Sequence, residues 1–164
     1  TDPIEVDEIS LTGDFQYVPF APLPALNING NGIVATPNGE KLVISHSSLG
    51  LIYLVDPNTG ASIKIDLGGV ELESADGLAI KGRTLYVVQN FINQISVVEL
   101  SPDYTEGEVV EVITNSEFKI PTTAALFGNR LYAVNARFDV APPPFLPNGG
   151  PNNIVFDVIG VPAK

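Results

Sequence analysis

The chain has 164 residues, of which 45% are hydrophobic, and its 19 acidic and 8 basic side chains give a formal net charge of -11. This charge argues against nucleic acids and anionic membranes as partners, because both are polyanions. The sequence has no cysteine and one histidine, which excludes disulfides, thiolate metal sites and metal centres built from several imidazoles.

The composition favours an all-β protein. Short runs of Val, Ile, Tyr and Phe are separated by 15 glycines, 14 prolines and several asparagines, which is typical of many short strands joined by tight turns. The chain has no methionine, so Thr1 is not a translation start and we expect a processed fragment of a longer precursor. The processed N-terminus and the scarcity of lysine favour a secreted or extracellular location.

Residues 1–25 contain two strand-like runs, Ile4 to Leu11 and Asp14 to Phe20. A cluster of prolines at residues 19–24 follows and is typical of a linker. We predict that the two runs are the outer strands of a structural unit whose inner strands are absent from this chain.

Three later segments repeat one pattern, in which a polar residue and a small residue open an apolar run, and a tight turn leads into a second apolar run. The segments begin at Asn31, Asp76 and Thr122, at spacings of 45 and 46 residues. A period of this length with four strands per unit is typical of β-propeller blades.

Three blades are expected, at residues 26–74, 75–120 and 121–164. Each of the first two contains four predicted strands. The third contains a proline- and glycine-rich loop at residues 139–152 and a single strand after it, at residues 153–161, because proline removes the donors that a regular strand needs. We therefore predict one partial β-propeller domain, with about three four-stranded blades that form half of a six-bladed propeller.

Half a propeller exposes apolar blade faces and unpaired strand edges unless a partner covers them. We expect this partner to be the complementary N-terminal half of the same precursor. A homodimer of this chain is the alternative.

The predicted hairpins place polar residues together. The first two strands of each blade form a hairpin, in which residues that face each other have a constant sum of residue numbers. The innermost strand of a propeller lines the central channel, so we expect the first member of each polar pair to ring one mouth of the channel and the second to form a ring slightly further out. The pairs are Asn31 opposite His46, Asp76 opposite Val88 and beside Gln89, and Thr122 opposite Asn135.

The segments Asn31-Gly32-Ile33 and Asp76-Gly77-Leu78 are each followed by a glycine turn and a strand of the Leu-Tyr-Val kind. Over roughly residues 26–140 they resemble blades of the SMP-30/gluconolactonase/luciferin-regenerating family. This resemblance implies a six-bladed propeller with one divalent metal in its channel, held by a glutamate, an asparagine and an aspartate. It implies Asn31 and Asp76 as two of the metal ligands, with the glutamate in the other half of the propeller.

Amide and carboxylate oxygens are hard ligands that suit Ca²⁺ first, with Mg²⁺ or Zn²⁺ as alternatives. A divalent ion would polarise a lactone or ester carbonyl and lower the pKa of a bound water. His46 is the candidate proton shuttle, because histidine titrates near neutral pH. The predicted function is thus a metal-dependent lactone or ester hydrolase acting on a small molecule, with Asp76 and His46 as its catalytic residues.

The same residues also have a structural interpretation. Asn-Gly and Asp-Gly are common turn dipeptides, so Asn31 and Asp76 alternatively only shape the start of a strand. His46 is then a hydrogen-bonded structural histidine.

The remaining polar residues are linked to chemistry more weakly. Thr122, Gln89 and Asn135 are expected to line the channel without a chemical role. Arg137 either binds an anionic substrate or pairs on the surface with one of the many carboxylates. These interpretations leave an alternative function, a non-catalytic secreted propeller that binds or scaffolds a partner and holds at most a structural metal.

Overall fold

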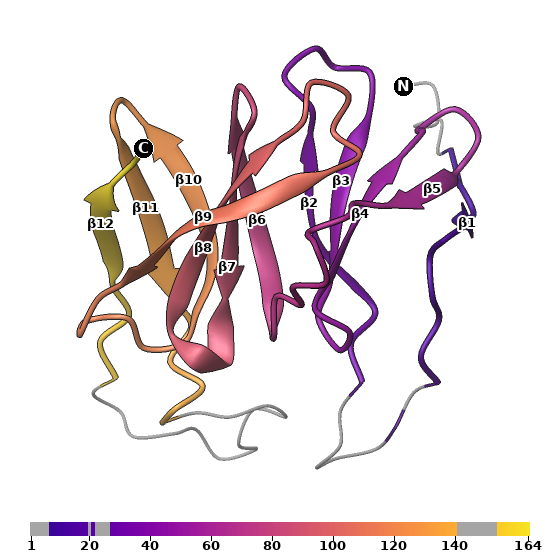
Figure 1. Cartoon of the computed structure of the whole chain (residues 1–164). Coiled ribbons are helices and arrows are strands. Elements are labelled where there is room, and N and C mark those ends of the chain that lie inside the picture. Colours follow the sequence, from indigo (N-terminus) through magenta and orange to yellow (C-terminus); the bar gives the residue numbers. More distant parts are fainter. Residues whose placement is uncertain (1–6, 20, 22–26, 141–153) are drawn as a thin grey trace, which may run out of the picture.

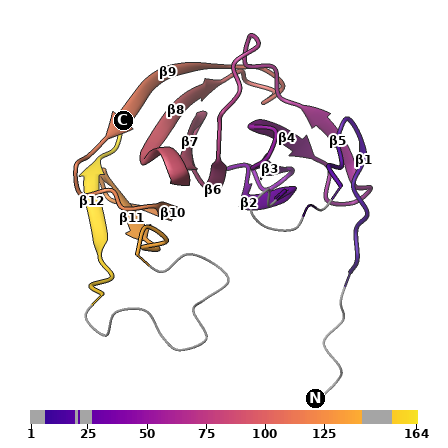
Figure 2. The same ribbon diagram turned by 90° about the horizontal axis from the view of Figure 1, so that it is seen from below.

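The computed structural model describes residues 7–19, 21, 27–140 and 154–164. In these residues the strands form three sheets arranged around an arc (Figure 1). When the chain is seen from below, the sheets radiate outward like the blades of a propeller (Figure 2). The all-β prediction and the prediction of a partial propeller are therefore confirmed. No helix in the described part of the chain is long and apolar enough to cross a membrane.

The first blade consists of β2 (Gly30–Ala35), β3 (Leu42–His46), β4 (Leu51–Val55) and β5 (Ala61–Lys64), in this order from the inside outward. A fifth strand, β1 (Thr12–Gly13), lies at the outer edge and runs parallel to β5.

The N-terminal segment differs from its prediction. Its described part, residues 7–19, contains no strand other than β1. Its hydrogen bonds go to the free edge of the first blade, where the Thr12 and Asp14 amides donate to the carbonyls of Gly60 and Ser62 at 2.9 and 3.0 Å. Over these residues the expectation of two outer strands of a preceding blade is wrong, because the segment completes an edge that already exists.

The second blade has four antiparallel strands, as the repeat predicts. They are β6 (Ala75–Lys81), β7 (Thr84–Gln89), β8 (Gln94–Leu100) and β9 (Gly107–Thr114). Between β7 and β8 lies a single 3-10 turn, η1 (Asn90–Ile92).

The third blade has three strands, β10 (Pro121–Phe127), β11 (Arg130–Asn135) and β12 (Val158–Pro162). β12 is the single strand after the proline- and glycine-rich loop, and it begins at residue 158 and not at 153. Most of that loop, residues 141–153, lies outside the described residues, as do residues 22–26 of the proline-rich linker.

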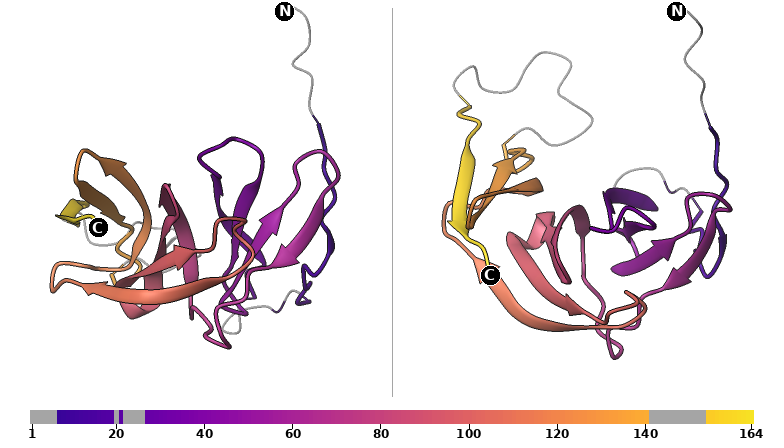
Figure 3. Two further views of the ribbon diagram at one scale, coloured as in Figure 1. Left: turned by 45° about the horizontal axis from the view of Figure 1, so that its top comes forward. Right: turned by 90° about the horizontal axis from the view of Figure 1, so that it is seen from above.

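The inner strands β2, β6 and β10 lie side by side nearest the axis of the arc (Figure 3). The middle blade is covered on both faces, so β7 and β8 are buried along nearly their whole length, whereas β2 and β10 alternate between exposed and covered residues. Burying one such aliphatic side chain contributes about 1.5–3 kcal/mol, so the two seams between blades stabilise the fold most. The first seam includes Val43, Ile52, Leu78 and Leu85, and the second includes Tyr86, Val88, Leu131 and Ala133.

Two inner-strand glycines permit the close approach of neighbouring blades. A Cβ atom on Gly77 would lie 2.5 Å from the Cα atom of Thr123, and one on Gly32 would overlap the carbonyl oxygen of Asp76. Both glycines lie within strands and neither has a positive φ. The Asn-Gly and Asp-Gly dipeptides are therefore not turns, and Asn31 and Asp76 each lie at the second position of a strand.

We predict that Gly77→Ala lowers the free energy of unfolding by about 1–3 kcal/mol, because the added methyl group meets backbone atoms that cannot move aside. The matched control is Gly30→Ala, where a Cβ atom would meet the Ile44 and Phe15 side chains at an ordinary 3.7 Å. Urea denaturation of the two variants measures the difference. Equal destabilisation by both would contradict the role assigned to Gly77.

Candidate metal-binding site at one end of the inner strands

Each inner strand contains a bulge at its polar residue. The register of the hairpin shifts at this point in all three blades. A bulge adds one residue to one strand, which re-aims the side chain and alters the pairing. The predicted pairs of the first and third blades are therefore wrong by one residue, because a constant sum assumes a regular ladder, whereas the second blade keeps the predicted register at Gln89. The observed pairs are Gly30 with His46, Ala75 with Gln89, and Pro121 with Asn135.

The bulges nevertheless bring Asn31 and Asp76 together from adjacent blades. The Asn31 side chain lies close enough to the Asp76 carboxylate to lower its pKa, and it donates to the Ser47 hydroxyl at 2.9 Å. The backbone of Asp76 is fixed from the first blade as well, because the Ser45 hydroxyl donates to its carbonyl at 2.7 Å. The same hydroxyl accepts the Gly32 amide at 2.8 Å, so one serine joins the two inner strands.

Sequence reasoning missed a third member of this cluster, Asn90. Its amide nitrogen donates to the Asp76 carboxylate at 2.8 Å, and the residue is 5% exposed. The available signal was its position, because it directly follows the second strand of the blade whose inner strand carries Asp76.

The Asp76 carboxylate is half-buried and lacks a cationic partner. Burial raises its pKa, and the hydrogen bonds from Asn90 and Asn31 offset only part of that effect. None of the ion pairs in the described part of the chain involves Asp76. A bound cation would compensate the negative charge of Asp76, whereas neutral amides compensate it only partly.

The donor set fits a hard divalent cation. Asp76 supplies an anionic oxygen, and Asn31 and Asn90 each carry an amide oxygen, although that of Asn90 already accepts the Phe91 amide at 2.7 Å. Oxygen-only sets suit Ca²⁺ or Mg²⁺ better than Zn²⁺, which favours nitrogen and sulfur. Within residues 7–19, 21, 27–140 and 154–164, no three His, Cys, Asp or Glu side chains form a metal-binding group. The described residues would thus supply only part of the ligands that such an ion needs.

His46 is fully buried and both of its ring nitrogens are engaged. Nδ1 accepts the Leu49 amide at 3.2 Å, while Nε2 lies 3.0 Å from the Gln16 carbonyl and 3.1 Å from the Asn29 amide oxygen. Two acceptors at Nε2 and a donor at Nδ1 require the neutral tautomer with its proton on Nε2. Burial lowers the pKa of the ring. These contacts are those of the structural histidine, and they leave no nitrogen free to move a proton.

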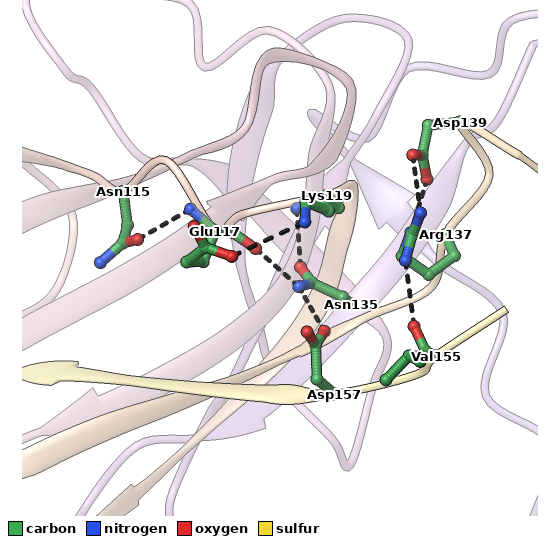
Figure 4. A network of polar contacts seen from close by, with 8 residues as sticks. All are labelled: Asn115, Glu117, Lys119, Asn135, Arg137, Asp139, Val155 and Asp157. Carbon is green, nitrogen blue, oxygen red and sulfur yellow. Dashed lines mark hydrogen bonds and ion pairs between the residues drawn. The ribbon is translucent and has the colours of Figure 1, made fainter.

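Gln89 and Asn135 occupy the positions that correspond to His46 in the other two blades. They are 2% and 0% exposed. Gln89 donates to the Glu73 carbonyl at 2.8 Å, and Asn135 donates to the Glu117 carbonyl at 2.8 Å, so each ties down the loop that leads into an inner strand (Figure 4). The expectation that these two residues line an open channel is wrong, because their side chains point into the protein.

Thr122 keeps the predicted position on an inner strand. It is half-buried on β10, and its carbonyl oxygen would lie 2.6 Å from a Cβ atom on Gly77. Arg137 is not a free anion-binding group. Its guanidinium pairs with Asp139 at 3.0 Å and donates to the Val155 carbonyl at 3.0 Å (Figure 4), which confirms the surface-pairing interpretation.

A cavity of about 570 Å³ adjoins the cluster. Ser47 and Asn90, which contact Asn31 and Asp76, are part of its wall. The cavity lies between the loops of the first and second blades. Its other lining residues are Asn27, Ile28, Ser48, Leu49, Gly50, Glu71, Glu73, Ser74 and Phe91.

Comparison with known proteins shows the fold and not a family. No model of a known protein family matches the sequence, and no curated protein matches it. Solved structures do match. Hydrazine synthase of Kuenenia stuttgartiensis superposes with a TM-score of 0.51 at 22% identity, over 65% of this chain and 30% of that one.

A luciferin-regenerating enzyme matches with a TM-score of 0.52 at 19% identity, over 68% of this chain and 39% of that one. The major allergen Mala s 1 of Malassezia sympodialis matches with a TM-score of 0.51 at 16% identity, over 74% of this chain and 38% of that one. This chain therefore spans less than two fifths of the length of each of these structures. At such identities the similarity shows a shared propeller fold.

The buried His46 gives the protein a specific acid sensitivity. Because its pKa is lowered in the folded state, the unfolded chain binds the proton first, and stability falls as the pH drops below about 6.5. We expect the unfolding free energy to fall by at most about 1.4 kcal/mol per pH unit between pH 7 and 5. His46→Asn should remove this slope, whatever its effect on overall stability. An unchanged slope in urea titrations of that variant would contradict the prediction.

Proposed function

We propose that this chain binds a divalent cation, Ca²⁺ first, through Asp76 and Asn31 and takes part in hydrolysis of a lactone or related ester. The observation that carries the proposal is the half-buried Asp76 carboxylate, which accepts a hydrogen bond from the Asn90 amide, lies near Asn31 and forms no ion pair with any described residue. The cluster adjoins a cavity large enough for a small molecule.

The residues of the cluster have separate roles in this proposal. Asp76 supplies the negative charge that holds the ion, and Asn31 supplies a neutral oxygen from the adjacent blade. Asn90 orients the carboxylate through its 2.8 Å hydrogen bond. When bound, the ion would polarise the acyl carbonyl and acidify a water. The proposal assigns no proton transfer to His46.

One line of reasoning supports hydrolysis. The sequence resembles the SMP-30/gluconolactonase/luciferin-regenerating family at the Asn31 and Asp76 segments. The fold is similar to that of a luciferin-regenerating enzyme, which at 19% identity supports the fold alone. A secreted location and the choice of metal stay predictions.

Replacing the central carboxylate separates metal binding from folding. Because burial raises the pKa of Asp76, its ionised form destabilises the metal-free protein at neutral pH. We predict that Asp76→Asn raises the melting temperature in a chelator and loses the stabilisation by Ca²⁺. In the unsubstituted protein that stabilisation should reach about 2.7 kcal/mol at a Ca²⁺ concentration of 100 Kd.

The matched control is Asp103→Asn. Asp103 is exposed, and its pKa is lowered chiefly by the hydrogen bond from the Ser101 side chain, so its loss should slightly lower stability. It should leave the response to Ca²⁺ intact. Thermal unfolding of both variants with and without Ca²⁺ makes the comparison. A Ca²⁺ response that survives in Asp76→Asn would refute the proposed ligand.

Turnover is tested directly on chelated protein. We expect Ca²⁺ to restore hydrolysis of a panel of lactones and esters, and Asp76→Asn to abolish it. Binding of Ca²⁺ without turnover across the panel would favour the alternative function, a non-catalytic propeller that binds or scaffolds a partner.

We further propose that more blades of the same repeat complete the ring, as the complementary half of one precursor. Large apolar side chains remain exposed on the two end blades, with Ile33 58%, Phe127 79% and Val158 59% exposed. Such blades would continue the seams that already join the three described blades. Native mass spectrometry tests this, and a complex of two identical 17.4 kDa chains would favour the homodimer.

A further inference from the structure

The cavity beside the candidate metal site is lined by both apolar and acidic residues. The apolar ones include Ile28, Leu49 and Phe91, and the acidic ones are Glu71 and Glu73. No lysine, arginine or histidine is among the described residues that line it. A ligand in this cavity therefore meets an apolar surface and negative charge together.

Phe91 is presented by a rigid turn. The residue is 56% exposed, although the preceding Asn90 is only 5% exposed. The side-chain amide of Asn90 holds the turn through two hydrogen bonds. Its oxygen accepts the backbone amide of Phe91 at 2.7 Å, and its nitrogen donates to the Asp76 carboxylate at 2.8 Å. Asn93 closes the turn in the left-handed conformation, with its amide donating to the Asn90 carbonyl. The same residue that orients Asp76 thus also holds the backbone of Phe91, whose side chain is exposed.

The charge near this ring stays negative when a metal binds. Glu71 and Glu73 are exposed, and neither belongs to an ion pair of the described part of the chain. With Asp76 they contribute three negative charges, and a divalent cation leaves one uncompensated. Anionic ligands are therefore repelled both with and without the metal.

We propose that this cavity selects neutral lactones or esters that carry an aromatic or aliphatic group, with Phe91 as the platform for that group, and that Glu71 and Glu73 expel the product. This inference rests on the proposed hydrolysis. Water adds to the acyl carbon, the acyl carbon–oxygen bond breaks, the leaving oxygen takes one proton from the water, and the new acid releases the other. A neutral substrate thus becomes a carboxylate, which the cavity disfavours.

Binding measurements test the selection without turnover. The probes are dihydroquinolinone, a neutral lactam with the shape of dihydrocoumarin, and melilotate, the carboxylate that forms when dihydrocoumarin opens. Calorimetry in Ca²⁺ should show tighter binding of the lactam. Phe91→Ala should weaken lactam binding about three- to tenfold, because it removes the aromatic platform. The double variant Glu71→Gln/Glu73→Gln should bind melilotate more tightly and leave the lactam unaffected.

The matched control is Phe127→Ala, which removes an exposed aromatic side chain from the third blade, away from the residues that line the cavity. It should change neither affinity. Equal binding of the two probes by the unsubstituted protein, or equal effects of Phe91→Ala and Phe127→Ala, would overturn the inference. If Asp76→Asn shows that no metal binds but lactam binding still depends on Phe91, the proposed hydrolysis fails and the ligand selectivity stands.

Discussion

The close contact between neighbouring inner strands is the constraint on which the rest of this structure depends. Gly32 lies against the carbonyl of Asp76, and Gly77 lies against Thr122 and Thr123. At this separation the apolar faces of adjacent sheets close over each other and form two continuous seams. The same contact brings Asn31 and Asp76, which are 45 residues apart in the chain, close enough for Asn31 to lower the pKa of the Asp76 carboxylate.

A second structural feature recurs in every blade and positions the loops at the end of the strands where the candidate site lies. The last residue of the second strand is a buried polar side chain that bonds to the segment before the inner strand. His46, Gln89 and Asn135 differ in chemistry but share this role. Because these side chains are committed to backbone groups, they stabilise the loops around the candidate site and do not enter its chemistry.

At the candidate site, the proposed binding group Asp76 lowers the stability of the folded chain. Asp76 is held in a half-buried position with a raised pKa, where an amide in its place would be less costly. Asn90 connects this carboxylate to Phe91 and so links the proposed ion to the wall of the adjoining cavity. In the proposal, charge compensation, orientation and ligand selection would be joined through these two contacts.

The blade repeat, the strand order within blades and the pairing of Asn31 with Asp76 could be predicted from the sequence, because periodic apolar runs and their turns are local patterns. The bulges could not, since an extra residue in one strand does not change the pattern of apolar residues, and they shifted the predicted pairs of the first and third blades by one position. Only the tertiary structure decided that His46 is a buried neutral ring and that Asn90 reaches Asp76. Both depend on contacts between segments that meet when the sheets pack, and no spacing within one segment encodes such contacts.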